Sequence, residues 1–277
     1  MKNILVLIPN YNGGKFIRET IIFLKKGIKN ATVLVVDDCS LDNPASYLEG
    51  IADYCIYKSQ NSGYAGTVNL GLKYFLDSPK YDLVLITNSD IQIDKDKAKC
   101  ISDAIHISMS KPEIGGLGFL ENSDKNSNFY EGTNMSGFLF VISRDVVSKV
   151  GFLDEGFYMY GEEQDYFSRV LNAGFKLLQS GVIVNHKAEG SGKSSIKNSW
   201  YAIRNSIFLD FKTKKLKKII RKIIALFALI NRVYKPNNLD DPSYIRITRP
   251  GIFFGNMMII GAIFWNLKKS LNREKYD

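Results

Sequence analysis

One aspartate in this chain, Asp90, stands where a buried strand is expected to end. The preceding residues 83–87 (LVLIT) are apolar or β-branched without a polar break, which predicts a strand buried on both faces. Ligands of open α/β sheets bind outside the carboxyl ends of the strands, so the Asp90 carboxylate is placed to contact one. A plain polar turn is the alternative, because Asn88, Ser89 and Asp90 are all turn-forming residue types.

A histidine, His186, closes a second short apolar stretch at residues 182–184. Hard divalent cations such as Mg²⁺ prefer carboxylate oxygens and are completed by substrate phosphates, while Mn²⁺ also accepts an imidazole nitrogen. Asp90 and His186 could therefore hold Mn²⁺ or Mg²⁺ together. Taken alone, His186 is better explained as a histidine that is only hydrogen-bonded at a strand end.

Three acidic residues, Glu162, Glu163 and Asp165, lie within four positions just before a predicted helix at 166–172. Like-charge crowding and burial raise the pKa of such carboxyl groups, which suits a general base. Acidic residues also commonly occupy the start of a helix because they complement its dipole. The sequence leaves both interpretations open.

The first ninety residues alternate between apolar strands and helices. Strand, polar turn and helix at this pitch predict βαβ units and a mostly parallel sheet flanked by helices. Polar or acidic clusters end the first, second and fourth strands, and they would line one edge of that sheet. The strands are expected at 2–8, 32–36, 54–57 and 83–90, then at 115–119, 138–142, 176–178 and 182–184, with a surface helix at 95–109.

The composition disfavours several classes of protein. The 277 residues are 45% hydrophobic and 23% charged, ordinary values for a globular chain. Three separated cysteines without a CxxC pair argue against a disulfide framework or a zinc cluster and fit a reducing compartment. No GxGxxG or GxxxxGK[ST] motif follows the first strand, which disfavours the common dinucleotide fold and the P-loop.

The net charge of +9 is concentrated in one segment. Residues 211–235 contain nine Lys or Arg and no acid, and the rest of the chain holds 28 basic and 28 acidic residues. Apolar and basic side chains of this segment separate on a helical wheel, which predicts an amphipathic helix lying on an anionic membrane surface. A helix docked on its own domain is the alternative, and nucleic acid is not expected as a partner because the body is neutral.

The segment 251–267 is apolar but contains two asparagines. It is shorter than the roughly 20 residues that span a bilayer. We therefore expect a helix that lies near the membrane or a partner subunit and does not cross the bilayer.

Eight short motifs, taken together and in order, resemble those of the inverting family 2 glycosyltransferases. The likeness is closest to the rhamnosyltransferase-like branch of bacterial surface-polysaccharide synthesis. No motif is specific alone, but their order over residues 1–210 is hard to reach by chance. They are IPNYN (8–12), VVDDCSLD (35–42), NSGYAGTVN (61–69), NSD (88–90), GFLDE (151–155), YGEEQD (160–165), His186 and YAIRN (201–205).

This resemblance implies a GT-A domain at 1–210, followed by a helical C-terminal extension at 211–277. Asp90 would be the last carboxylate of the family's DxD-type motif, with His186 as an additional ligand of Mn²⁺ or Mg²⁺. Glu163 matches the position of the catalytic base. The nucleotide-sugar donor, expected to be a UDP- or dTDP-sugar, would be held by Pro9, Tyr11, Asp37, Asp38, Asn61, Gly63, Gly66, Asn69 and Asn88.

Two departures from the family pattern affect the site. Asn88 replaces the first DxD carboxylate, which weakens the metal site without removing it. Glu162 and Glu163 replace the usual Glu-Asp pair, and the longer side chain leaves the base open between Glu162, Glu163 and Asp165.

The resemblance implies a single in-line displacement of the donor's nucleoside diphosphate by a hydroxyl of a glycan or lipid-linked acceptor. The enzyme would be cytoplasmic and peripheral on the inner face of the cell membrane, and a homo-oligomer is left open. One alternative is a non-catalytic GT-A-like scaffold at the membrane. A nucleotidyltransferase is a weaker one, because no glycine-rich loop with Arg or Lys follows the first strand.

Overall fold

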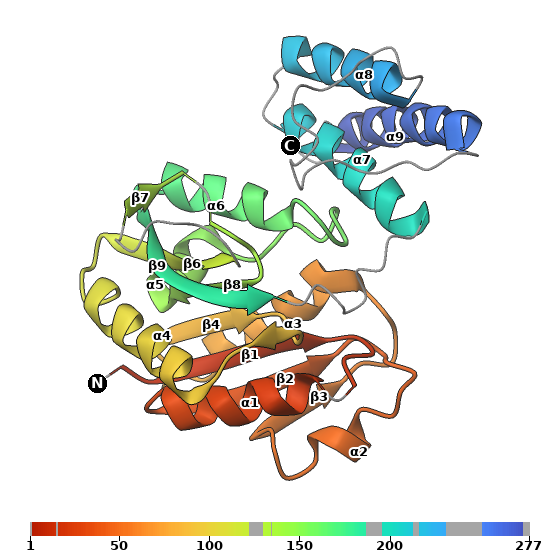
Figure 1. Ribbon diagram of the computed structural model, residues 1–277. Coiled ribbons are helices and arrows are strands. Elements are labelled where there is room, and N and C mark those ends of the chain that lie inside the picture. Colours follow the sequence, from red (N-terminus) through yellow and green to blue (C-terminus); the bar gives the residue numbers. More distant parts are fainter. Residues whose placement is uncertain are drawn as a thin grey trace. The chain divides into compact units, whose positions relative to one another are not determined.

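The computed structural model describes residues 2–14, 16–121, 130–133, 135–186, 196–212, 216–230 and 251–273. The chain divides into two compact units, Met1–Lys193 and Ser194–Asp277 (Figure 1). The first is an α/β unit and the second is helical in its described part. Each unit is described by itself below.

Among the described residues, nine strands form one sheet in the order β3-β2-β1-β4-β8-β6-β9-β5, with β7 paired to β9. β3, β2, β1 and β4 are parallel, as the sequence predicts. Beyond β4 the sheet is mixed, because β8 runs antiparallel to β4 and β6. The strands are β1 (Ile4–Asn10), β2 (Ala31–Asp37), β3 (Tyr54–Tyr57), β4 (Leu83–Thr87), β5 (Ile91–Gln92), β6 (Ile114–Glu121), β7 (Tyr130–Gly132), β8 (Leu139–Ser143) and β9 (Lys176–His186).

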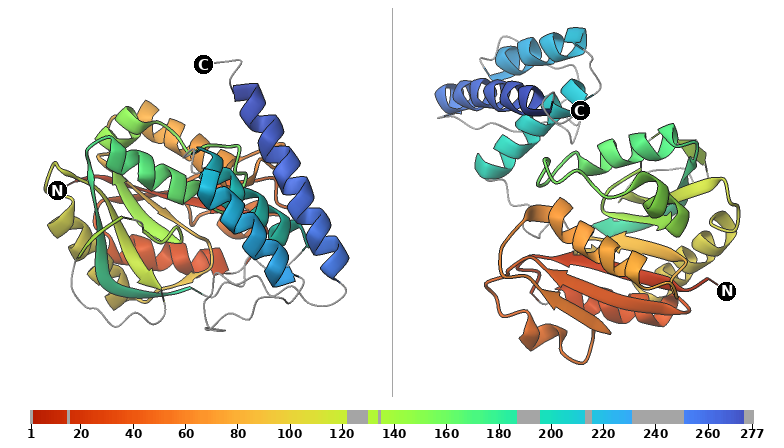
Figure 2. Two further views of the ribbon diagram at one scale, coloured as in Figure 1. Left: turned by 90° about the horizontal axis from the view of Figure 1, so that it is seen from above. Right: turned by 180° about the vertical axis from the view of Figure 1, so that it is seen from behind.

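Helices cover both faces of the sheet because successive strand residues point to opposite sides. α1 and α4 pack on the face that carries Val6 and Leu85, and α3, α5 and α6 pack on the face that carries Leu7 and Val84. Figure 1 and the view from behind in Figure 2 show α1 and α3 on opposite sides of the strands. The helices are α1 (Phe16–Gly27), α2 (Ala45–Leu48), α3 (Gly63–Asp77), α4 (Lys95–Ser108), α5 (Arg144–Val150) and α6 (Glu162–Asn172).

The helix-covered sheet confirms the α/β fold with flanking helices. β4 lies in its middle, and all five of its residues are buried, as their apolar run predicts. β1, which pairs with β4, and β2, which pairs with β1, are buried along most of their length.

The carboxyl ends of β1, β2, β4, β6 and β9, like that of β3, lie at one edge of the sheet. β1, β2 and β4 run in one direction, β8 reverses it, and β6 and β9 restore it. The side chains that end or follow these strands therefore meet at the same edge, as ligand-binding residues of open α/β sheets do. They are Asn10, Asp37, Asn88, Glu121 and His186.

Two expected elements differ in the structure. The strands expected at 176–178 and 182–184 are one strand, β9, because Gln179 pairs in register with Gly118 of β6 and Tyr130 of β7 and so continues the ladder. α6 begins at Glu162 and not at 166, since Gly161 takes a left-handed conformation with φ of 91° and starts the helix. The acidic residues thus form the first turn of α6.

The described part of the second unit consists of α7 (Ile196–Lys212), α8 (Leu216–Ile230) and α9 (Gly251–Arg273). α7 packs with α8 and α9 through Ile203, Ile219 and Ile259, so its residues before 210 belong to this unit and not to the first. None of the helices in the described ranges is long and apolar enough to cross a membrane.

The amphipathic helix expected in the basic segment is α8. Ile219 is buried in the unit, while Ile220 and Ile224 are 50% and 62% exposed. Asp210 of α7 forms ion pairs with Lys218 and Lys222, so part of the basic charge is neutralised. Residues 213–215 and 231–235 of the basic segment lie outside the described residues.

Candidate active site

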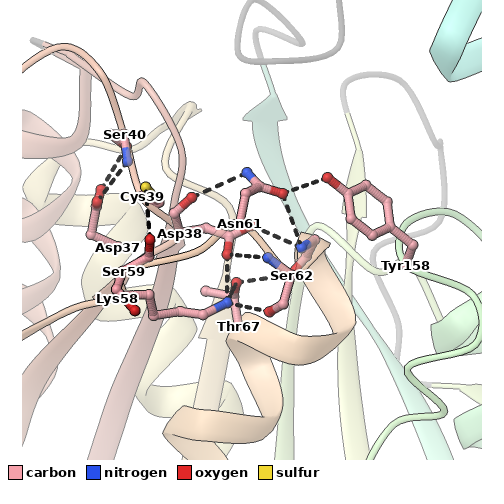
Figure 3. A network of polar contacts seen from close by, with 11 residues as sticks. Asp37, Asp38, Cys39, Ser40, Lys58, Ser59, Asn61, Ser62, Thr67 and Tyr158 are labelled. Atoms are coloured by element: carbon pink, nitrogen blue, oxygen red, sulfur yellow. Dashed lines mark hydrogen bonds and ion pairs between the residues drawn. The ribbon is translucent and has the colours of Figure 1, made fainter.

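At the end of β2, Asp37 holds the turn that follows the strand. Its Oδ1 accepts hydrogen bonds from Asn10 Nδ2 at 2.7 Å and Ser40 Oγ at 2.6 Å. Its Oδ2 accepts one from the Ser40 backbone N–H at 2.9 Å (Figure 3). Asn10 and Asp37 are both buried, so these bonds tie the ends of β1 and β2 together away from water.

The next residue, Asp38, connects β2 to the N-terminus of α3. Its two carboxylate oxygens accept from the backbone N–H groups of Ser62 at 2.8 Å and Gly63 at 2.9 Å. Lys58, with 13% of its side chain exposed, forms an ion pair with Asp38 and donates to Thr67 Oγ1 at 3.2 Å (Figure 3). The carboxylate thereby satisfies N–H groups that the first turn of a helix leaves without partners.

Pro9, Tyr11, Asp37 and Asp38 lie at the same edge, where the sequence predicts a nucleoside to bind. Both carboxylates accept several hydrogen bonds from the chain itself, whereas Tyr11 is 38% exposed. These bonds show that Asp37 and Asp38 stabilise the loops at this edge of the sheet. Their contact with a nucleoside stays a prediction.

The start of α3 carries the predicted donor-pocket residues Asn61, Gly63, Gly66 and Asn69. Gly63 has φ of 76°, and a Cβ there would lie 2.5 Å from Tyr158 O, so only glycine fits. Asn69 is buried and pairs with the backbone of Leu153, donating to its carbonyl and accepting from its N–H, both at 2.9 Å. Asn61 accepts a hydrogen bond from the Tyr158 hydroxyl. Asn61 and Asn69 thus hold the loop before α6 against α3.

A second cluster lies where β4, β6 and β9 end. His186 Nε2 is 3.0 Å from Asp90 Oδ1, and His186 Nδ1 is 2.9 Å from Glu121 Oε1. Asn88 Nδ2 lies 3.4 Å from His186 Nε2. The imidazole ring stacks on Phe138, with 5.3 Å between ring centroids and 15° between planes. The structure therefore brings Asp90, Asn88 and His186 together and adds Glu121.

The carboxylates around His186 raise the pKa of its imidazole. Burial alone lowers the pKa of the imidazole, but the hydrogen bonds and charges of Asp90 and Glu121 outweigh burial and raise it above its usual value. The site is therefore one that favours positive charge between its carboxylates.

The spacing of Asp90 and His186 fits a hard divalent cation. An octahedral ion with ligand distances of about 2.1 Å places neighbouring ligands roughly 3 Å apart. The 3.0 Å between Asp90 Oδ1 and His186 Nε2 matches that separation. Within the described ranges no group of three or more His, Cys, Asp or Glu could hold a metal ion. A cation here would take its other ligands from water and from donor phosphates.

Two adjacent glutamates occupy the first turn of α6. Glu162 is 2% exposed, and its Oε2 has no hydrogen-bond partner among the described residues. Burial, and then the charge of Glu163, raise the pKa of Glu162 well above its usual range. Burial also raises the pKa of Glu163. Carboxyl groups with raised pKa values are suited to accept a proton in catalysis.

The dipeptide Gly137-Phe138 connects these glutamates to the histidine cluster. A Cβ on Gly137 would lie 2.2 Å from Glu163 Oε1, so the absent side chain leaves room for that carboxylate. Phe138 accepts a hydrogen bond from the Asn88 N–H at 2.9 Å and stacks on His186. Glu163 therefore lies one residue away from the backbone that supports Asn88 and His186.

The third acid, Asp165, has a structural partner. Its Oδ2 accepts from Arg169 Nε at 3.0 Å, and Arg169 also donates to the carbonyls of Val150 at 3.1 Å and Phe152 at 2.8 Å. Asp165 is 5% exposed. This ion pair anchors the end of α5 to α6.

The loop before α6 contains two tyrosines in a rarely occupied conformation. Tyr158 and Tyr160 have φ of 67° and 68°, which bulky residues seldom adopt. Such backbone strain concentrates at functional sites, where the surrounding contacts maintain it. Here the backbone carbonyl of Tyr158 accepts from the Ala65 N–H at 3.2 Å.

Sequence reasoning missed Glu121, Lys58 and the role of Asn10. Glu121 lies two residues beyond the strand expected at 115–119, and only the parallel pairing of β6 with β9 brings it to His186. Lys58 directly follows the strand at 54–57, as Asp37 and Asp38 directly follow the strand at 32–36. These matching positions at the ends of two strands could have predicted the ion pair.

Comparison with known proteins agrees with this geometry. Residues 5–105 match the family described as Glycosyl transferase family 2. The chain is 23% identical over 239 residues to the low-salt glycan biosynthesis hexosyltransferase Agl10 of Haloferax volcanii, covering 78% of this chain and 75% of Agl10.

Solved structures of glycosyltransferases share the fold. The mannosyltransferase PcManGT from Pyrobaculum calidifontis, in complex with GDP-Man and Mn²⁺, superposes with a TM-score of 0.60 and 14% identity over 96% of this chain and 87% of that one. TarS 1–349 of S. aureus gives a TM-score of 0.55 and 16% identity over 94% and 80% of the two chains. Residues 5–105 therefore match a family 2 glycosyltransferase domain, and the fold of the chain is the GT-A fold of solved glycosyltransferases.

Proposed function

We propose that this protein transfers a hexosyl residue, with inversion, from a nucleotide-diphosphate sugar to a hydroxyl group of a glycan acceptor. The family match supports glycosyl transfer, and the relative Agl10 is named a hexosyltransferase of glycan biosynthesis. PcManGT is described with a nucleotide sugar and Mn²⁺, and its fold resembles that of this chain.

The contacts of Gly137-Phe138 are the single observation that carries this proposal. They set the Glu163 carboxylate, with its raised pKa, beside the Asn88, Asp90 and His186 cluster. Transfer with inversion needs a base on the acceptor side and charge stabilisation on the leaving-group side. These two clusters supply one of each at neighbouring positions.

Glu163 is the proposed base. It accepts the proton of the acceptor hydroxyl while that oxygen attacks the anomeric carbon from the side opposite the diphosphate, and the sugar is inverted. Glu162 lies fully buried next to it and is the alternative base. Asp165 is not chosen, because its carboxylate is paired with Arg169.

Asp90 and His186 are the proposed ligands of Mn²⁺ or Mg²⁺, which would neutralise charge developing on the departing diphosphate. Asn88 adds no charge there, so the donor's own phosphates supply the remaining anionic ligands. Tyr11, Asn61 and the α3 N-terminus are proposed to contact the nucleotide. Whether the hexose is rhamnose is decided by the donor screen below.

The acceptor is proposed to be a lipid-linked glycan at an anionic membrane surface, as in surface-polysaccharide synthesis. α8 exposes Lys217, Lys218 and Arg221 together with Ile220 and Ile224. α9 exposes an apolar stripe at helical spacing, made of Met257, Ile260, Phe264 and Leu267. Apolar and basic groups on one helical unit suit interfacial binding.

Vesicle flotation of the full chain tests the membrane part. The protein should float with phosphatidylglycerol vesicles and not with phosphatidylcholine vesicles. Ile260→Ser with Phe264→Ser should reduce binding, whereas Lys99→Ser, on the other unit, should not. Equal binding by all three proteins would remove α9 from the proposed contact, and a wild type that does not float with phosphatidylglycerol vesicles would remove the membrane from the proposal.

A donor screen tests the catalytic part. UDP-, dTDP- and GDP-sugars are incubated with the protein and Mn²⁺, and donor hydrolysis or transfer is measured. Glu163→Gln should lower turnover by about 10²-fold or more with donor affinity retained. Gln164→Ala, an exposed position on the same turn, is the matched control and should be fully active. Wild-type turnover by Glu163→Gln would reject Glu163 as the base.

A further inference from the structure

The carboxylate of Glu121 contacts the side of His186 that faces away from Asp90. Glu121 ends β6, which runs parallel to β9, and the register brings Glu121 opposite Val184, two residues before the histidine. Glu121 Oε1 lies 2.9 Å from His186 Nδ1, and Asp90 Oδ1 lies 3.0 Å from His186 Nε2. The imidazole is thus held between two carboxylates, with Phe138 stacked on its face.

Two carboxylates compete for the single proton of a neutral imidazole. If the proton is on Nε2, it is donated to Asp90, and Nε2 has no lone pair for a metal ion. If the proton is on Nδ1, it is donated to Glu121, and the Nε2 lone pair faces the Asp90 oxygen. Two electron-rich atoms 3.0 Å apart then create a place that a cation can fill.

We infer that Glu121 is a positioning residue that fixes His186 in the Nδ1-protonated form and so prepares Nε2 for a divalent cation shared with Asp90. This inference rests on the metal site of the proposed function. Metal-ligating histidines commonly donate their other N–H to a carboxylate, which sets the tautomer and the ring orientation.

A contact with only a structural role is the competing explanation for Glu121. Its side chain is 45% exposed, against 15% for His186, so an isolated ion pair here contributes little to stability. A structural role would therefore change neither metal affinity nor the tautomer of His186. These two quantities separate the explanations.

Mn²⁺ binding to the full chain, followed by the loss of the free-ion electron paramagnetic resonance signal, is the first measurement. Loss of an outer carboxylate partner weakens metal binding by about 10-fold to 100-fold, and the exposure of Glu121 favours the lower figure. Glu121→Ala should thus weaken Mn²⁺ binding by about 10-fold, and Glu121→Gln, which keeps an oxygen acceptor, should weaken it less. Glu131→Gln, an exposed glutamate of β7 that pairs with Lys176, is the matched control and should bind Mn²⁺ as the wild type does.

The tautomer of His186 is the second measurement. The chain has two histidines, so ¹⁵N-histidine labelling gives only two imidazoles, and His186→Asn assigns them. In metal-free protein at alkaline pH, the neutral ring should be protonated at Nδ1 in the wild type and should shift toward Nε2 in Glu121→Ala.

The outcomes distinguish this inference from the proposed function. If His186→Ala and Asp90→Ala weaken Mn²⁺ binding but Glu121→Ala changes neither affinity nor tautomer, the role of Glu121 is rejected and the metal site stands. If Asp90→Ala and His186→Ala bind Mn²⁺ as the wild type does, the metal site itself is rejected, and the inference with it.

Discussion

Two groups of carboxylates at the same edge of the sheet are surrounded by opposite kinds of atoms. Asp37 and Asp38, at the end of β2, accept hydrogen bonds from backbone N–H groups, Asn10, Ser40 and Lys58. At the ends of β4, β6 and β9 and the start of α6, Asp90 and Glu121 share one imidazole, and Glu162 and Glu163 lie against each other. The first group is paired with several donors of the chain, whereas in the second group Asp90 and Glu121 share a single imidazole and the two glutamates of α6 crowd each other.

This difference indicates which carboxylates support the fold and which await a ligand. Buried charge that the chain compensates stabilises the connections between strands and helices, and its loss exposes unpaired donors. Buried charge that the chain leaves crowded costs stability, and a proton, a cation or a substrate relieves that cost. The first group should therefore control stability and the second should control activity.

Replacing Asp90 with alanine gives the largest expected effect. Asp90 is a proposed ligand of the catalytic cation, so its removal should lower transfer by about 10³-fold and weaken donor binding. The free energy of unfolding should change little. Turnover and urea unfolding, measured on the same preparation, test the effects on activity and on stability. An Asp90→Ala protein with wild-type turnover would contradict the assignment of Asp90 to the carboxylates that control activity.

Replacing Asp38 with alanine should have the reverse effect. The change removes the ion pair of the partly buried Lys58 and the acceptor of the Ser62 N–H at the start of α3, which costs about 3–5 kcal/mol. Urea unfolding measures the loss. Glu131→Ala, which breaks the exposed pair with Lys176, should cost less than about 1 kcal/mol and serves as the control. An Asp38→Ala protein of unchanged stability would show that the first group is not structural.

The sequence predicts the parallel half of the sheet because continuous apolar runs are visible without any partner. The run at 83–87 becomes β4 with the same residues, and 54–57 becomes β3. β9 is not predicted as one strand, because Gln179 and Ser180 are polar, although both are buried and Gln179 pairs with β6 and β7. Local polarity cannot reveal a partner that is distant in sequence.

The same limit applies to the site. Asp90 and His186 follow apolar stretches and could be selected by residue type, and the structure places them in contact. Glu121 is an ordinary glutamate in its local sequence and gains its position from strand order alone. The structural role of Asp165 depends on Arg169 and on carbonyls of the loop after α5, which residue types do not disclose.

The pH dependence of transfer should reveal the crowded glutamates. A base works when it is deprotonated, and burial raises the pKa of Glu163 above the glutamate reference of about 4.3. The transfer rate should therefore rise with pH through this raised pKa, and its acidic limb should lie above pH 4.3. Initial transfer rates, measured from about pH 4.5 to about pH 8.5 in steps of about one pH unit, test this expectation. A rate independent of pH over that range would contradict a base with raised pKa.

Replacing Glu162 with glutamine should give the smallest effect, and its sign opposes the usual result of mutating a buried residue. Burial and Glu163 raise the folded-state pKa of Glu162, so the folded state binds the proton more tightly than the unfolded state. The resulting cost is absent below the unfolded pKa, grows as pH rises toward the folded pKa, and is complete above it. Glutamine keeps the shape without the charge.

Glu162→Gln should therefore stabilise the protein at pH 8 by about 1 kcal/mol, the size of many stabilising substitutions, and should lose this advantage at pH 4. Thermal unfolding at the two pH values measures the difference, with Gln164→Ala as the control from the same turn. A protein destabilised equally at both pH values would mean that the Glu162 carboxylate is compensated after all. In that case Glu162 would be a structural carboxylate like Asp37 and Asp38, and Glu163 alone would remain as the candidate base.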